Sequence, residues 1–126
     1  MEKYIFESGP INDVSWGRFK IFGKEHYKRY DGTIVGAGKD IRIYKGEVSP
    51  WKERDGHFLT EDMITGVEGC EILIIGNGFN GAITLSNEIY KRFKNLIVKR
   101  TPQACRLFNK LYSEGKNVAL LAHGTC

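Results

Sequence analysis

The sequence lacks several features that would assign it to a compartment or a chemistry. None of its hydrophobic runs approaches the ~18 apolar residues of a membrane-spanning helix. Residues 1–10 carry charges within their only apolar stretch, so they predict neither a signal peptide nor an Arg-rich transit peptide. The three cysteines cannot all pair with one another, and their spacing matches no zinc pattern. We therefore expect a cytoplasmic protein with no membrane segment, no metal site and no cofactor.

The composition is that of an ordinary globular protein. Of the 126 residues, 41% are hydrophobic and 27% are charged. We expect one domain, residues 1–126, because this length suits a single hydrophobic core. The net charge of +4 admits an anionic ligand or an acidic partner, but a surplus this small does not favour nucleic-acid binding.

The first half of the chain has the alternating pattern of antiparallel strands. Val14–Phe22 alternates between apolar and basic residues, Gly23 provides a turn, and Glu25–Tyr30 returns, which predicts a β-hairpin. Asp40–Tyr44 alternates in the same way and predicts a third strand.

The alternation ends after this third strand. Lys45–Asp55 is predicted to be a loop anchored by Trp51. Thr60 has the character of an N-cap for a short helix from Glu61 to about Val67, with acidic residues in its first turn.

The second half alternates between buried strands and helices. Ser86 and Thr101-Pro102 are predicted to begin the two helices, and Gly115 to end the second one. The predicted elements, in order, are strand Ile72–Ile75, helix Asn87–Lys94, strand Leu96–Val98, helix Pro102–Glu114 and strand Asn117–Ala122. Short connections in a β-α-β-α-β order predict parallel strands with right-handed crossovers, and hence a mixed α/β domain of two or three layers.

Four stretches in this order resemble one known family. They are Trp51 with Gly56–Met63, Leu73–Gly78, Thr101–Asn109 followed by Leu111, Glu114 and Gly115, and the closing His123–Cys126. With this spacing, the chain over about residues 14–126 resembles the Mth938-like domain family, also known as DUF498 or complex I assembly factor 3-like.

The resemblance implies a fold but no chemistry. It implies a three-layer (β+α)/β/α fold with a central mixed β-sheet, an N-terminal antiparallel β-hairpin and a C-terminal βαβαβ half. Animal relatives are linked to respiratory complex I assembly or to adipogenesis, and no catalytic residues carry over. The chain departs from the family's usual form in its glycine-rich segment Gly32–Gly38 and in the long stretch Gly76–Ser86.

The spacing Gly76, Gly78, Gly81 matches the G-x-G-x-x-G pattern of dinucleotide-binding loops. That function needs a helix beginning inside the pattern, whereas the predicted N-cap is Ser86. It also needs an acidic residue about twenty positions later, where the chain has Ile97–Arg100. We therefore predict a tight turn after a buried strand.

A milder possibility is a small anion site at the same sheet edge. The backbone at Gly76, Asn77 and Gly78 would face the helix start at Thr101, and Arg106 would supply positive charge. This is our predicted ligand site.

Cys105, His123 and Cys126 form the set that invites a nucleophile or a metal. Cys105 falls in the first turn of a predicted helix, where backbone amides lower a thiol pKa. We favour instead a small buried thiol and an unrelated terminal cysteine. His57, amid carboxylates, is predicted to lie in a solvated turn.

The hairpin also interleaves aromatic and basic residues, a pattern that can stack single-stranded nucleic acid. The aromatics are Trp16, Phe19, Tyr27 and Tyr30, and the basic residues are Arg18, Lys20, Lys28 and Arg29. We favour one core face and one solvated face.

The leading functional prediction is a non-enzymatic binding or assembly module for a protein partner or small anionic ligand. One alternative is an enzyme or ligand sensor with a pocket near the Gly76–Gly81 loop, Thr101 and Cys105. A nucleic-acid accessory protein is the other alternative.

Overall fold

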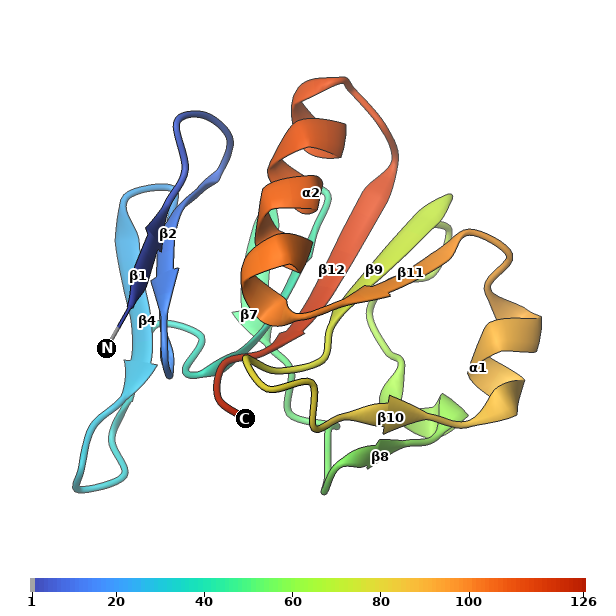
Figure 1. The fold of residues 1–126 in the computed structure, drawn as a ribbon, viewed down its shortest axis with the longest axis horizontal. Helices are drawn as coiled ribbons and strands as arrows, with labels where there is room; N and C mark the ends of the chain where they lie inside the picture. Colours follow the sequence, from blue (N-terminus) through green and yellow to red (C-terminus); the bar gives the residue numbers. More distant parts are fainter. Residues whose placement is uncertain (1) are drawn as a thin grey trace.

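The protein is built in three layers around a central five-stranded sheet (Figure 1). The computed structural model describes residues 2–126; Met1, the first residue of the predicted domain, lies outside this range. Its elements are β1 (Lys3–Ile5), β2 (Ile11–Ser15), β3 (Arg18–Ile21), β4 (Lys24–Lys28), β5 (Ile34–Val35), β6 (Asp40–Tyr44), β7 (Glu47–Pro50), β8 (Phe58–Leu59), the 3-10 helix η1 (Glu61–Met63), β9 (Ile72–Gly76), β10 (Thr84–Leu85), α1 (Asn87–Arg92), β11 (Leu96–Lys99), α2 (Thr101–Ser113) and β12 (Val118–His123).

The central sheet has the order β11-β9-β12-β6-β7. Strands β11, β9 and β12 are parallel, as the βαβαβ pattern predicted, whereas β6 and β7 join antiparallel to β12 and to each other. The predicted central mixed sheet is therefore confirmed. Within residues 2–126, no helix is both long enough and apolar enough to cross a bilayer.

The N-terminal strands form a separate antiparallel meander in the order β1 to β5. The predicted hairpin is present as β3 and β4, but the prediction of one strand over Val14–Phe22 was wrong. The chain turns at Trp16-Gly17, where Gly17 adopts a positive φ of 73°, so that β2 and β3 pair with each other. The alternation of apolar and polar residues continues across this tight turn, so the sequence pattern is the same as that of a single strand.

Four smaller elements also differ from prediction. The predicted loop after Tyr44 contains β7, and β8 pairs in parallel with β10 across the third layer. The predicted helix from Glu61 contracts to the single turn η1, and neither Thr60 nor Ser86 makes a side-chain cap hydrogen bond. These short pairings are non-local, and strands of two residues carry no periodicity.

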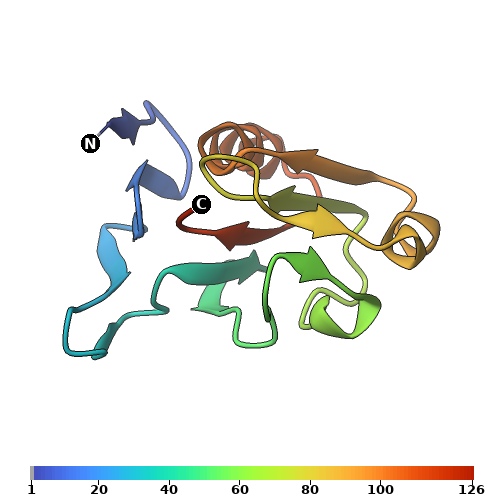
Figure 2. The same cartoon turned by 60° about the horizontal axis from the view of Figure 1, so that its bottom comes forward.

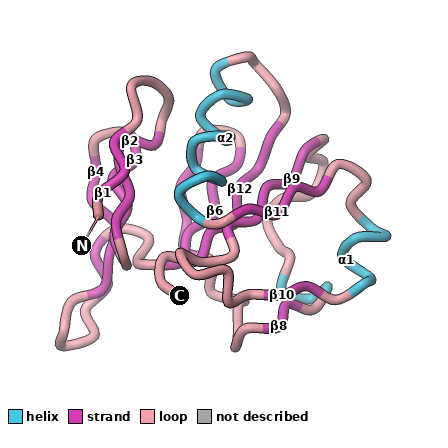
Figure 3. The backbone as a smooth tube through the Cα atoms, viewed as in Figure 1, coloured by secondary structure: helices cyan, strands magenta, loops and turns pink. Residues whose placement is uncertain are grey.

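The two faces of the central sheet are covered by different layers. Side chains of β9 alternate: Ile74 packs beneath α2 and the N-terminal sheet, whereas Leu73 and Ile75 pack against Trp51 and the β8–β10 layer. Trp51 is buried, as predicted. Figure 2 shows the N-terminal sheet standing beside α2, and Figure 3 shows how little of the chain is helical.

One buried side chain ties α2 to the N-terminal sheet. The Asn109 side chain accepts a hydrogen bond from the Ile11 amide at 2.9 Å and donates one to the Ile11 carbonyl at 2.8 Å. Asn109 is only 4% exposed, so water does not compete for these bonds. The amide clamp therefore fixes the position of β2 on the helix.

Replacing this clamp tests its contribution directly. Asn109→Ala is expected to lower the free energy of unfolding by about 2–4 kcal/mol, because both backbone groups of Ile11 lose a buried partner. Exposed Asn95 donates to the Glu71 carbonyl, and Asn95→Ala is the matched control, with an expected loss below about 1 kcal/mol. Urea unfolding measures both; equal losses would contradict the clamp.

Candidate functional site

The glycine loop after β9 lies at the carboxyl edge of the parallel strands, where the C-terminal segment folds against it (Figure 1). The Phe79 amide donates to the Thr125 carbonyl at 2.7 Å. The amides of Asn80 and Ala82 both donate to the Cys126 carbonyl at 3.1 Å. The loop amides therefore hold the chain's own carbonyl oxygens.

The remaining amides of this loop also have partners within the chain. Those of Asn77, Gly78, Gly81 and Ile83 donate to the Lys99 carbonyl, the Thr101 hydroxyl, the Gly78 carbonyl and the Asn77 carbonyl, respectively. No amide from Asn77 to Ile83 is therefore free for a ligand in this arrangement, and the anion site at Gly76, Asn77 and Gly78 stays a prediction.

Gly78 has a packing reason to be glycine. Its φ is 102°, and a Cβ at this position would collide with the backbone of Cys126. Glycine is therefore required here by the close approach of the C-terminal segment.

Thr101 connects the loop to the last strand. The prediction that Thr101 caps α2 was wrong, because Arg100 occupies the N-cap position. The Thr101 hydroxyl instead accepts from the Gly78 amide at 3.0 Å and donates to the His123 carbonyl at 2.6 Å. Thr101 is fully buried, so the hydroxyl is a structural bridge.

Cys105 and Arg106 contact other parts of the molecule than the glycine loop and the C-terminal segment. Cys105 is fully buried among apolar residues, and burial raises the pKa of its thiol. This environment opposes the thiolate that a nucleophile or a metal ligand requires. The Arg106 guanidinium lies over the Phe6 ring, 5.4 Å from its centroid. Cys105 is thus the small buried thiol that the sequence favoured, and a role of Arg106 in anion binding stays a prediction.

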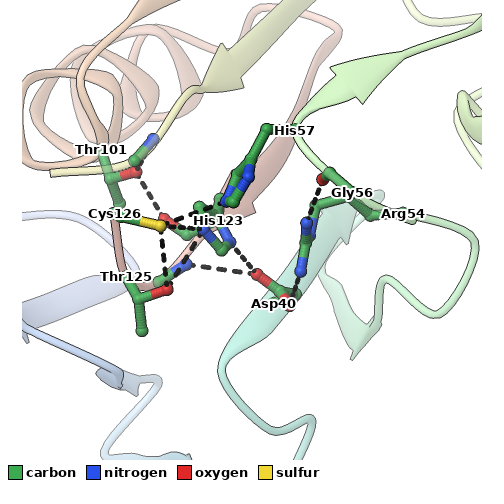
Figure 4. A network of polar contacts seen from close by, with 10 residues as sticks. Asp40, Arg54, Gly56, His57, Thr101, His123, Thr125 and Cys126 are labelled. Atoms are coloured by element: carbon green, nitrogen blue, oxygen red, sulfur yellow. Dashed lines mark hydrogen bonds and ion pairs between the residues drawn. The ribbon is translucent and has the colours of Figure 1, made fainter. Parts of the chain in front are cut away.

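Three other ligand-type side chains converge beside the loop (Figure 4). His57, His123 and Cys126 each offer one ligand atom, and these atoms lie within 4.8 Å of one another. The Cys126 sulfur is 3.2 Å from His57 Nε2 and 3.6 Å from His123 Nε2. His57 is exposed, Cys126 is half-buried and His123 is 2% exposed, so the cluster opens to solvent on the His57 side.

On its Nδ1 side, His123 contacts the Asp40 carboxylate, which in turn pairs with the Arg54 guanidinium. Asp40 Oδ1 is 2.6 Å from His123 Nδ1, and Asp40 Oδ2 accepts from Arg54 at 3.2 Å. Burial opposes ionisation of Asp40, but the bonds and charges of His123 and Arg54 outweigh it and hold the pKa of this carboxyl below its ordinary value. An ionised Asp40 fixes the hydrogen on Nδ1 and leaves His123 Nε2 as an acceptor, 3.1 Å from the Thr125 hydroxyl and 3.6 Å from the Cys126 sulfur.

Sequence reasoning selected His123 and Cys126 but missed their partners. His57 was assigned to a solvated turn, and it reaches the cluster because β8 pairs with β10 directly after the glycine loop. Asp40 was assigned to a strand without a role, and the pairing of β6 with β12 places it opposite His123. Both placements follow from strand pairing between distant segments, which residue patterns do not specify.

A second concave surface lies on the N-terminal sheet. It is a groove of about 730 Å³ lined by Arg18, Tyr27, Lys28, Arg29, Tyr30, Asp31 and Lys39. We call it the basic groove. Five of the eight interleaved residues of the predicted hairpin line this groove: Arg18, Tyr27, Lys28, Arg29 and Tyr30. Phe19 is instead fully buried in the core, and Trp16 and Lys20 lie outside the groove.

The layers described above define an α/β protein of the Mth938-like fold. Residues 11–123 match the family described as "Protein of unknown function (DUF498/DUF598)". The chain belongs to this family, and the resemblance noted in the sequence is confirmed.

Solved structures share this fold over nearly the whole chain. A conserved hypothetical protein, PH1505, from Pyrococcus horikoshii OT3 is 27% identical, with a TM-score of 0.74 over 92% of this chain and 98% of that one. A protein named MT938 is 24% identical, with a TM-score of 0.73 over 94% and 100% of the two chains. An outer membrane protein from Bartonella henselae is 21% identical, with a TM-score of 0.68 over 94% and 97%. The last two similarities concern the fold alone.

Substitution of Thr101 tests whether its hydroxyl bridge holds the glycine loop to the last strand. Thr101→Val keeps the shape but leaves the Gly78 amide and the His123 carbonyl without their partner, so we expect a loss of about 2–4 kcal/mol in unfolding free energy. Thr101→Ser keeps the hydroxyl and should cost about 1 kcal/mol, for the lost methyl group. Urea unfolding of both variants decides; a serine variant as unstable as the valine variant would contradict the bridge.

Proposed function

We propose that this chain is a non-enzymatic binding module that engages an acidic segment of a protein partner. The observation that carries the proposal is the basic groove, whose lining has four cations and one carboxylate. The whole chain has a net charge of only +4, so much of its positive surplus gathers at this one concave surface.

The cations of the groove are available to a partner. Within residues 2–126, Lys28, Arg29 and Lys39 have no ion-pair partner, and Lys28 and Arg29 are exposed. The Asp31 carboxylate accepts from the Thr33 amide at 2.9 Å within its own turn. Arg18 pairs with Glu25 at 3.3 Å, but both side chains are more than 40% exposed, where such pairs are weak.

The aromatic residues of the groove favour a peptide over nucleic acid. The Arg18 guanidinium lies 3.7 Å from the Tyr27 ring centroid and covers that face. Tyr30 is fully exposed at the tip of the β4–β5 loop. Stacking of successive bases needs several open aromatic faces, whereas one exposed tyrosine beside cations suits an acidic peptide.

The enzyme alternative depended on the Cys105 thiol and on the amides of the glycine loop, and both have structural roles. Cys105 is buried, and the amides from Asn77 to Ile83 have partners within the chain. A reducing cytoplasm is part of the proposal, since it suits Cys70, Cys105 and Cys126, which are free.

Charge reversal in the groove tests the proposal. A fluorescent glutamate-rich peptide should bind the protein at low salt, and the double variant Lys28→Glu with Arg29→Glu should weaken binding by at least about tenfold, because attraction becomes repulsion. Fluorescence anisotropy across a salt series measures both affinities, and binding by the unmodified chain should weaken as salt rises.

The matched control reverses two exposed lysines at the opposite end of the molecule. Lys91→Glu with Lys94→Glu, in and just after α1, makes the same change in net charge (Figure 1). Equal weakening by the two double variants would show only a net-charge effect and contradict a groove-specific site. Tighter binding of a single-stranded oligonucleotide than of the peptide would contradict the peptide assignment.

A further inference from the structure

The cluster of His57, His123 and Cys126 has the dimensions of a metal site. A tetrahedral zinc ion lies ~2.3 Å from a cysteine sulfur and ~2.0–2.1 Å from an imidazole nitrogen, which places the sulfur and nitrogen about 3.6 Å apart. The Cys126–His123 distance is 3.6 Å and the Cys126–His57 distance is 3.2 Å. All three ligand atoms lie within 4.8 Å of one another, and His57 is exposed, so its ring has room to close on an ion.

The residue behind His123 matches the outer partner of a metal-bound imidazole. Metal-bound histidines usually donate their second ring N–H to a carboxylate or a carbonyl, which fixes the ring and raises its basicity. Asp40 makes this contact at 2.6 Å, and it is itself held by Arg54 at 3.2 Å and by the Gly124 amide at 3.3 Å. His123 therefore presents Nε2 in a fixed orientation before any ion arrives.

The row Cys126–His123–Asp40 also has the order of a nucleophile, a base and an orienting carboxylate. Two observations favour a metal over that chemistry. A second imidazole, His57, lies even closer to the thiol than His123 does, and a nucleophile needs only one base. The amides from Asn77 to Ile83, three of which hold the Thr125 and Cys126 carbonyls, all have partners within the chain and are not free to stabilise an oxyanion.

We propose that His57 Nε2, His123 Nε2 and Cys126 Sγ form a three-ligand site for a zinc-class divalent ion. Two imidazoles and one thiolate suit zinc, and not the harder magnesium or calcium ions. The fourth position is open to water from the exposed His57 side. Binding releases the thiol proton to solvent and joins the β8 layer to the last strand.

Metal titration of the reduced, chelator-treated protein tests this site. Zinc should bind with 1:1 stoichiometry by calorimetry, and cobalt should produce thiolate-to-cobalt charge-transfer absorption that zinc then displaces. Cys126→Ser should abolish that absorption, and His57→Ala should weaken zinc binding by at least about tenfold. Because His57 is exposed, its variant is expected to fold normally.

The controls separate this site from other thiols and from the basic groove. Cys70→Ser removes a half-buried free cysteine outside the cluster and should leave cobalt absorption unchanged. The Lys28→Glu, Arg29→Glu variant should bind zinc normally, so failure of the groove proposal would leave this one standing. Asp40→Asn tests a positioning role and should weaken zinc about 10–100-fold while the cobalt–thiolate band persists.

Several results would overturn the proposal. They are the absence of stoichiometric zinc uptake, cobalt–thiolate absorption that survives Cys126→Ser, and zinc affinity that is unchanged by His57→Ala. A burst of acyl transfer from an activated ester that needs Cys126 and His123 but not His57, in a protein that takes up no zinc, would assign the cluster to nucleophilic chemistry instead.

Discussion

The contact between the glycine loop and the C-terminal segment determines the chemistry of this molecule. The amides of Phe79, Asn80 and Ala82 hold the carbonyls of Thr125 and Cys126, and the positive φ of Gly78 gives that backbone room to approach. A glycine pattern that elsewhere receives phosphate here receives the protein's own chain. Because the segment is docked, the Cys126 side chain is held beside His123, and His57 reaches both from the neighbouring layer.

Sequence patterns predicted the elements with strong local signals. The apolar run of β9 and the amphipathic helix α2 were predicted within one or two residues. A fully buried strand and a helix with one buried face each leave a clear hydrophobic pattern in the sequence. The mixed central sheet followed from their order. Short strands such as β8 and β10 could not be predicted, since two residues carry no period and their pairing joins distant segments.

The site was less predictable than the fold for the same reason. His123 and Cys126 lie close in sequence and were considered together with Cys105, whose thiol is fully buried in the core. Asp40 and His57 enter through the β6–β12 and β8–β10 pairings. Thr101 shows the limit of local rules: its position before Pro102 suggests a cap, yet its hydroxyl bridges two other segments.

The two proposed binding sites lie in different layers of the molecule. The basic groove belongs to the N-terminal sheet, whereas the histidine–cysteine cluster belongs to the central sheet and the β8 layer. X-ray absorption spectroscopy of the zinc-loaded protein tests the central claim most directly. We expect one sulfur at ~2.3 Å and two imidazole nitrogens at ~2.0–2.1 Å among the atoms bound to zinc. No bound sulfur, or more than one, would contradict the proposed site.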